Sequence, residues 1–364
     1  MRTVLFLASF AYQGQAPDPA ALPRATVTVH EERGELWVEL PAIDLPAGTV
    51  HEHGAEGGHV HDAAPGDPMA AIMPGYPPPV YLEWPLDASL YGFRVELVDM
   101  HGEVVPSELL HHFNLIDPAN RELFLPISRR LLAAGKETGE QTLPRFFFGM
   151  PVDKGAPAVA NAMLHNPTTT SYHGVTTRLV LKYRAPGRFL PIFDGFPFQL
   201  DVAFPVGDKS FDLPPGESSK SYDARPSIGG KIVAVSGHVH EYATRIELSE
   251  VETGKVLWSA APIVENEEVV SVPVGKLYGL FKVGATVRPD RTYRVTVTYI
   301  NPTGDTLPAG GMGVVGGLFV PDRGTVWPTA DRSNPLYVQD AVHYMRTETP
   351  SAAAATDAHA GHRP

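Results

Sequence analysis

Apolar and polar residues alternate along much of the chain with the period of two that is typical of β-strands. Apolar and aromatic residues recur on one face of two segments, residues 174–183 and 292–300: Val175, Leu179, Leu181 and Tyr183 in the first, and Tyr293, Val295, Val297 and Tyr299 in the second. Both segments predict half-buried antiparallel strands.

Shorter segments with the same pattern, separated by turn residues, predict further strands at residues 25–40, 91–99, 198–204, 231–248, 256–258 and 314–320. The best helical candidate is Ser128–Gly139, which is short, has no strong amphipathic stripe, and predicts one or two turns on a connection. Many short strands and few helices favour an all-β fold of sandwiches or barrels.

The chain has 364 residues, which suggests about two domains. The segment Arg184–Leu190 carries Pro186 and Gly187 after a strong strand, and we place the domain boundary there. We expect an N-terminal sandwich at residues 25–186, with a His-rich loop at 51–79, and a C-terminal sandwich at 187–345. Residues 346–364 are expected to form a disordered tail. No internal repeat with a fixed period is visible.

Charge and composition narrow the possible partners. Lys and Arg total 29 against 41 Asp and Glu, which gives a net charge of −12, and no basic cluster stands out. Nucleic acid and anionic membrane surfaces are therefore poor partners. No apolar run reaches the roughly 18 to 20 residues of a membrane span. The chain has no cysteine, so any metal must be bound by His, Met or carboxylate side chains.

The first residues resemble a short secretory signal, in which Met1-Arg2 precedes an apolar stretch from Val4 to Ala11. Residues 1–24 are accordingly predicted to be a signal peptide and leader. A secreted or periplasmic location follows from this interpretation. The alternative is a first strand or a disordered start.

Two histidine pairs are candidate metal ligands among the 15 histidines. His111 and His112 are adjacent, so they can share a metal only if the strand ends, bulges or twists there. His238 and His240 have the spacing that places both imidazoles on one face of a strand, which is a stronger metal signal. The alternative for this second pair is two surface histidines on a half-exposed face.

Met312 lies among glycines at residues 310–313, where it either fills a gap in the core or presents its thioether to a ligand. A set of His238, His240 and Met312 favours copper, especially Cu(I), over zinc. His165 is a further candidate ligand and shares a strand face with Met163. Both could equally have structural roles.

The histidines of residues 51–62 form either a metal-gathering loop or a solvated one. The chain shows no Walker loop, no G-x-S-x-G and no H-E-x-x-H, so phosphate-binding, serine-hydrolase and zincin functions find no support.

Several short motifs occur in a particular order. They are LHHFNLI at 110–116, LPR at 143–145, HNP at 165–167, LPPGE at 213–217, HVH at 238–240, and Met312 with Pro321 nine residues later. In this order the chain resembles the copper type II, ascorbate-dependent monooxygenases, the family of peptidylglycine alpha-hydroxylating monooxygenase and dopamine beta-monooxygenase.

The resemblance implies two tandem antiparallel jelly-roll β-sandwiches with one copper ion on each. By this resemblance His111 and His112 belong to an electron-transfer copper, and His238, His240 and Met312 to a catalytic copper that binds O₂. Ascorbate would reduce both ions, and a small organic substrate would be hydroxylated at a C–H bond.

This chain departs from the family pattern at several positions. The third histidine of the first copper site aligns with Met163, so either His165 replaces it, which we favour, or the site is His₂Met or is damaged. The substrate-anchoring arginine is Ser236 and the tyrosine after the methionine is Gly316, so a peptide ending in glycine is an unsuitable substrate. The family's disulfides are absent.

Three hypotheses follow from the sequence. The first is a dicopper monooxygenase acting on an unidentified small molecule. The second is a non-catalytic copper-binding or copper-gathering protein on the same scaffold. The third is a β-sandwich adhesion or structural module whose histidines are incidental. The oligomeric state and the physiological reductant do not follow from the sequence.

Overall fold

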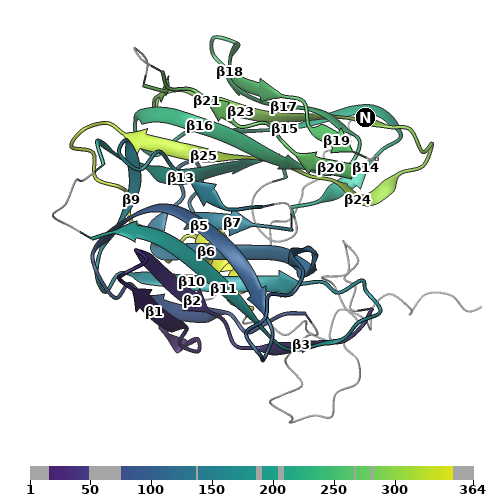
Figure 1. The fold of residues 1–364 in the computed structure, drawn as a ribbon. Helices are drawn as coiled ribbons and strands as arrows, with labels where there is room; N and C mark the ends of the chain where they lie inside the picture. Colours follow the sequence, from purple (N-terminus) through teal and green to yellow (C-terminus); the bar gives the residue numbers. More distant parts are fainter. Residues whose placement is uncertain are drawn as a thin grey trace, which may run out of the picture.

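The computed structural model describes residues 16–48, 75–136, 138–185, 191–203, 209–265, 268–279 and 283–346. These residues form mainly antiparallel sheets with a single α-helix, arranged as two tandem jelly-roll sandwiches (Figure 1), and only the short β12 pairs in parallel, with β9. The predicted all-β class and double-sandwich fold are confirmed. Residues 1–15 of the predicted signal peptide and leader, residues 51–74 of the His-rich loop and residues 347–364 of the tail lie outside the described residues.

The first sandwich has two sheets. One has the order β1 (Thr26–His30), β2 (Glu35–Glu39), β11 (Tyr172–Arg184), β5 (Ala88–Val98), β9 (Phe148–Val152), β12 (Phe193–Asp194), with β3 (Ile43–Leu45) on β11 and β8 (Gln141–Thr142) on β5. The other has the order β4 (Val80–Glu83), β10 (Pro157–Leu164), β6 (Leu110–Arg121), β7 (Ser128–Ala134).

The second sandwich repeats this plan. One sheet has the order β13 (Phe196–Asp201), β25 (Gly313–Pro321), β16 (Gly230–Val239), β21 (Gly275–Lys276), with β22 (Ala285–Val287) on β16. The other has the order β15 (Gly216–Ala224), β23 (Tyr293–Asn301), β17 (Ala243–Glu250), β18 (Lys255–Ala260). Two short two-stranded sheets complete the second sandwich. One pairs β14 (Phe211–Leu213) with β24 (Leu307–Gly311), and the other pairs β19 (Ile263–Glu265) with β20 (Glu268–Ser271).

Each sandwich has its own apolar core. Leu36, Phe113 and Leu181 are fully buried in the first core, and Ile246, Val297 and Phe319 in the second. Along β23 buried residues alternate with more exposed ones, as the sequence predicts. In Figure 1 the second sandwich lies above the first, and β13 faces β7 where the two meet.

The helix predicted at Ser128–Gly139 is wrong, because residues 128–134 form strand β7, which pairs with β6. Leu131 and Leu132 are buried in the sheet, and this tertiary burial overrides the weak local helical preference. The helix α1 (Pro335–Met345) was not predicted. Asn334 caps it by accepting a hydrogen bond from the Leu336 N–H, and Pro335 occupies its first turn.

No helix among the residues described here is long and apolar enough to cross a membrane. The predicted domain boundary at 184–190 stays a prediction, since residues 186–190 are not described.

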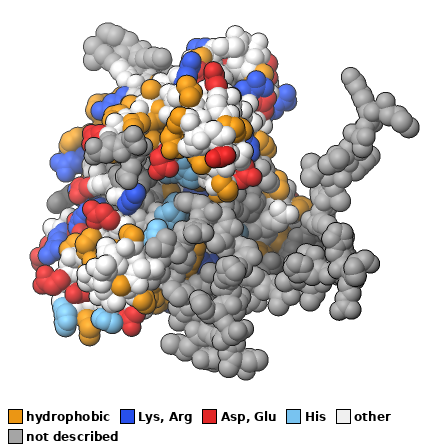
Figure 2. Space-filling model, turned by 90° about the vertical axis from the view of Figure 1, so that its right-hand side faces the viewer, with side chains coloured by type: hydrophobic (Ala, Val, Ile, Leu, Met, Phe, Trp, Pro, Cys, Tyr) orange, Lys and Arg blue, Asp and Glu red, His pale blue; other side chains and the backbone are white. Residues whose placement is uncertain are grey.

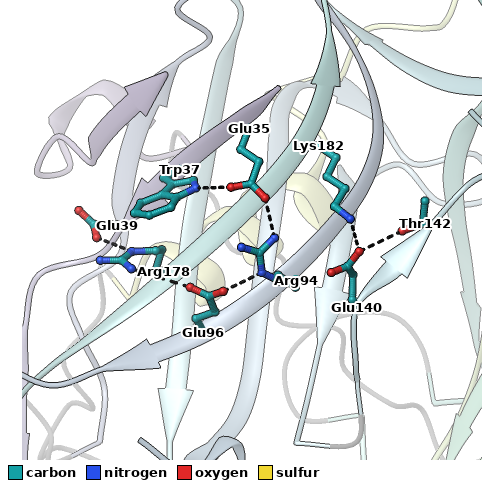
Figure 3. Close-up of polar contacts among 9 residues, drawn as sticks. All are labelled: Glu35, Trp37, Glu39, Arg94, Glu96, Glu140, Thr142, Arg178 and Lys182. Carbon is teal, nitrogen blue, oxygen red and sulfur yellow. Dashed lines mark hydrogen bonds and ion pairs between the residues drawn. The ribbon is translucent and has the colours of Figure 1, made fainter. Parts of the chain in front are cut away.

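A charged layer covers the outer face of the first sandwich (Figure 3). Arg94 binds Glu35 at 2.9 Å and Glu96 at 2.7 Å, and so links β5 to β2 across the face of the intervening strand β11. Arg178 binds Glu39 at 2.7 Å and places its guanidinium 4.3 Å from the centre of the Trp37 ring. Burial alone raises the pKa of Glu35, but hydrogen bonds from Arg94 and Trp37 outweigh it and lower the pKa below its ordinary value.

One buried asparagine, Asn166, holds a turn of the first sandwich through a set of side-chain hydrogen bonds, which we call an asparagine lock. The Asn166 side-chain N–H groups donate to the carbonyls of Leu45, Pro46 and Thr170 at 2.9–3.1 Å. Its side-chain oxygen accepts from the backbone N–H and the hydroxyl of Thr168. Asn166 is fully buried, so these bonds replace all contact with water.

The second sandwich contains the same lock. Asn301 donates to the carbonyls of Leu213, Pro214 and Asp305 and accepts from the backbone N–H and hydroxyl of Thr303. In both sandwiches the asparagine ties the turn after a central strand to a short strand that ends in Leu-Pro. The two halves are therefore built on one local plan, although no repeat of fixed period is visible in the sequence.

We predict that Glu35→Gln lowers the stability by about 1 kcal/mol at pH 7, because it weakens a half-buried ion pair. Since the folded pKa of Glu35 is depressed, its contribution is present above the unfolded pKa and is lost as pH falls through the folded pKa. The difference in the free energy of unfolding between wild type and variant, measured by urea denaturation, should therefore become smaller below about pH 4. The exposed Glu265→Gln serves as control. A difference in the free energy of unfolding between wild type and Glu35→Gln that stays constant with pH contradicts the prediction.

We predict that Asn166→Ala and Asn301→Ala each lower the free energy of unfolding by about 2 to 4 kcal/mol, because each leaves several buried carbonyls without a donor. Chemical denaturation measures both changes, and the exposed Thr169→Ala should have little effect. Equal stability of Asn166→Ala and Thr169→Ala would show that the lock does not hold the turn.

Candidate functional site

The first histidine cluster forms at a β-bulge. In the pairing of β10 with β6, Met163 lies opposite His112 and Leu164 opposite Leu110, so His111 is the extra residue of the bulge. The bulge brings the adjacent rings of His111 and His112 to 4.1 Å between centroids. The sequence indicated that a shared site would require such an irregularity.

His165 joins this cluster from the end of β10. Its backbone N–H donates to the Leu109 carbonyl at 2.8 Å, and its ring centroid lies 5.8 Å from that of His111. All three imidazoles are half-buried. Met163 stands directly opposite His112, on the same face of the sheet. His165 and Met163 thus both remain candidates for the third position.

The second pair lies at the end of β16. The rings of His238 and His240 are 5.7 Å apart and perpendicular. On the same face of β16, Ala234 packs with Leu318 and Val320 against Phe148 of the first sandwich. His238, four residues after Ala234 on the same strand, therefore projects toward the first sandwich. Figure 2 shows histidine side chains on both sides of the hollow between the sandwiches.

Tyr299 connects this pair to Met312. The buried Tyr299 hydroxyl accepts hydrogen bonds from the backbone N–H groups of His240 at 3.3 Å and Met312 at 2.9 Å. It donates to the Met312 carbonyl. Burial raises the pKa of Tyr299 to about 12, so the hydroxyl stays protonated and able to donate at neutral pH. The alternating pattern predicted Tyr299 on a strand but did not predict its hydrogen bonds to His240 and Met312.

The predicted site residues thus form two separate groups, His111 with His112 and His165, and His238 with His240 and Met312. Within the described part of the chain, no set of three or more His, Asp or Glu side chains is arranged as the ligands of a metal ion. Side chains would have to rotate for either group to converge on an ion.

Glu122, Arg129, Arg130 and their partners form a polar contact region, called the seam below, that joins the two sandwiches. No sequence pattern predicted it. Arg129 of β7 binds Asp117 at 2.6 Å and places its guanidinium 5.0 Å from the ring centres of Phe196 and Trp327 in the second half. The Trp327 indole N–H donates to the Arg121 carbonyl at 2.8 Å. One cation is thus held between two aromatic rings and a carboxylate.

Arg130 continues the seam on its other side. It binds both carboxylate oxygens of Asp340 on α1, which is 1% exposed. Asp340 also accepts from the Ser128 N–H at 3.1 Å, and Tyr344 packs near the Arg130 guanidinium. The Asp340 charge raises the pKa of Arg130 although burial opposes it. Two adjacent arginines therefore hold different elements to the same strand.

Glu122 completes the seam. Its carboxylate is fully buried and accepts from the backbone N–H groups of Leu123, Arg130 and Gln199 at 3.0–3.2 Å. Gln199 belongs to β13 of the second sandwich, so this carboxylate links the backbones of both halves. Burial raises the pKa of Glu122, while the three N–H donors favour the ionised form.

No family model matches the chain, and no curated protein matches it. Among solved structures, the chain is similar to PNGF-II in its C2 crystal form, with 7% identity and a TM-score of 0.37 over 81% of this chain and 66% of that chain. It is also similar to a structure of Sulfolobus turreted icosahedral virus, with 10% identity and a TM-score of 0.32 over 74% of this chain and 94% of that one.

The mavirus major capsid protein gives 9% identity and a TM-score of 0.22 over 88% and 92% of the two chains. The chain spans slightly less than two thirds of the length of PNGF-II. At these identities and TM-scores the likeness carries no information about ligands or activity.

The predicted membership of the copper type II, ascorbate-dependent monooxygenase family is wrong. No family model and no curated protein supports this membership, the similar structures named above are PNGF-II and viral proteins, and the described residues contain no formed metal-ligand group. The predicted C–H hydroxylation and the alternative of a copper-gathering protein are wrong with it.

The structure gives a physical reason for this error. The HNP and LPPGE motifs that supported the resemblance are parts of the two asparagine locks, in which Asn166 and the carbonyls of Leu213 and Pro214 take part. Such short motifs are explained by local turn chemistry, so they do not require a shared function. Copper and ascorbate as cofactors, and O₂ and a small molecule as partners, stay predictions.

Proposed function

We propose that this chain is a rigid structural or adhesion module, a double sandwich that works through its shape and surface. The observation that carries the proposal is the buried seam of Arg129, Arg130 and Glu122, which ties both sandwiches and α1 into one body. A secreted or periplasmic location suits such a module and is part of the proposal.

The seam favours one relative orientation of the halves. Asp340 is buried, the Arg130 side chain is 14% exposed, and the two meet through two parallel hydrogen bonds, a geometry that tolerates little displacement. Burying two charges costs desolvation energy, so such a pair adds little net stability but strongly penalises arrangements that separate its partners. A hinge between the sandwiches would break the Glu122 contact with β13 and separate Arg129 from the Phe196 and Trp327 rings.

We predict that Asp340→Ala lowers the free energy of unfolding by about 3 to 5 kcal/mol, because it leaves the Arg130 charge buried without a partner. Urea denaturation followed by tryptophan fluorescence and by circular dichroism measures this, with the exposed Asp290→Ala as control. Wild type should unfold in one transition by both probes. Two separate transitions in the wild type would contradict the proposed rigid module.

A further inference from the structure

We infer that strand β1 (Thr26–His30) is the site at which a second copy of this chain pairs with the first, edge to edge, so that the two first sandwiches share one continuous sheet. β1 lies at the edge of its sheet, and among the described strands only β2 pairs with it. The inference goes beyond the proposed rigid module, because it names the partner of the module and the strand that binds it.

An edge strand directs alternate backbone N–H and C=O groups away from its sheet, where a further strand can pair with them. Two edges of the first sandwich are closed to such pairing. The strand β4 is covered by the preceding chain, because the Ala25 N–H donates to the Tyr81 carbonyl at 2.9 Å and the Tyr81 N–H donates to the Pro23 carbonyl at 2.8 Å. The strand β12, at the opposite edge of the sheet that contains β1, has only 2 residues.

The other long edges of the four large sheets are closed by polar groups. On β7 the N–H groups of Ser128 and Arg130 donate to buried carboxylates of the seam, and on β13 the Gln199 N–H does the same. Charged residues lie along the outer strands β15 and β18 of the second sandwich: Glu217, Lys220, Asp223 and Lys255. Charged side chains on an edge oppose the addition of another strand.

Within the described structure, β1 has none of these protections. Its sequence, Thr-Val-Thr-Val-His, contains no proline, lysine, arginine or carboxylate, and its valines and threonines favour strands. Its pairing with β2 runs through all 5 residues without a bulge, so the edge is regular enough to accept another strand. Figure 1 shows β1 on the lower side of the first sandwich, away from the second sandwich.

The strand is complementary to itself in one antiparallel register. Pairing centred on Thr28 sets Val27 of each copy opposite Val29 of the other. The ends of the strand then pair Thr26 with His30. Val27 and Val29 pack against the first core, whereas Thr26 and Thr28 are exposed, so like faces meet. A shift of one residue would set valine opposite threonine, and a shift of two would leave strand residues unpaired.

Charges beyond the ends of β1 favour the same register. Continuing the pairing brings Arg24 of each copy to the hairpin loop 31–34 of the other copy, where Glu31 and Glu32 are exposed. The Arg24 side chain is 61% exposed, and its contact with Glu83 at 3.3 Å lies at the surface. Such exposed pairs add little affinity, but they favour the antiparallel register over a shifted one.

The interface is small, because each copy contributes a single strand. We expect a dissociation constant on the order of 100 µM, as for contacts below the standard interface size. Below about 10 µM the chain then remains a monomer of 39.4 kDa. Sedimentation equilibrium should accordingly show the average mass rising with concentration toward that of a dimer.

Thr28→Lys tests the edge, because Thr28 lies on the two-fold axis and its side chain is exposed in a single copy. Two lysines directly opposite each other should raise the dissociation constant at least about tenfold. Thr28→Glu should do the same, whereas an equimolar mixture of the two variants should associate again, because opposite charges then meet. Ser221→Lys, at an exposed position of the edge strand β15, is the matched control and should leave association unchanged.

Cysteine substitutions test the register, since the chain has no cysteine of its own. Opposed residues of an antiparallel pair have Cα atoms about 4.5–5.5 Å apart, within the reach of a disulfide. With diamide as the oxidant, Thr28→Cys should therefore form a covalent dimer at least about tenfold faster than Thr26→Cys. The two Thr26 positions would lie about 13 Å apart along the paired strands, too far for a disulfide.

Three results would each overturn the inference. The first is a wild type that remains monomeric at about 500 µM. The second is equal association of Thr28→Lys and Ser221→Lys, which would place the contact elsewhere. The third is equal cross-linking of Thr28→Cys and Thr26→Cys, which would exclude the register. None of them alters the unfolding test of the rigid module, so the two proposals can fail separately.

Discussion

The structure depends most on the two adjacent arginines of strand β7. Arg129 is held between two aromatic rings and Asp117, and Arg130 is held by Asp340 of α1. Arg129 is buried and the Arg130 side chain is only 14% exposed, so the loss of their partners would leave poorly solvated charges. This constraint fixes the second sandwich and the C-terminal helix against the first. It also fixes the relative placement of the two histidine groups, which lie on different sandwiches.

Each histidine group owes its geometry to a different local device. In the first, a bulge turns the adjacent His111 and His112 toward each other, and the turn locked by Asn166 follows directly after His165. In the second, the hydroxyl of Tyr299 holds the Met312 segment to the end of β16. The same asparagine lock recurs in both sandwiches, whereas the histidines occupy different strands. The scaffold is thus shared by the two halves and the candidate sites are not.

The strands could be predicted from the sequence because period-two alternation is a local signal, as along β11 and β23. The strand at Ser128–Ala134 was mistaken for a helix, because its pairing with β6 and its buried arginines are tertiary features. His238 and His240 could be placed on one face from spacing alone. The approach of His165 to His111, the hydroxyl bridge of Tyr299 and the partners of Arg130 join residues far apart in sequence, and no local pattern encodes them. Short motifs were misleading where turn chemistry alone explains them.

The central claim is that both sandwiches move as one rigid body. Backbone ¹⁵N relaxation measures the rotational correlation time of each sandwich separately in the same sample. The account predicts one common correlation time, expected for a particle of 39.4 kDa, for amides of β11 and of β23. Distinct and shorter correlation times for the two sandwiches would contradict it, because they would require the buried arginine seam to open in solution.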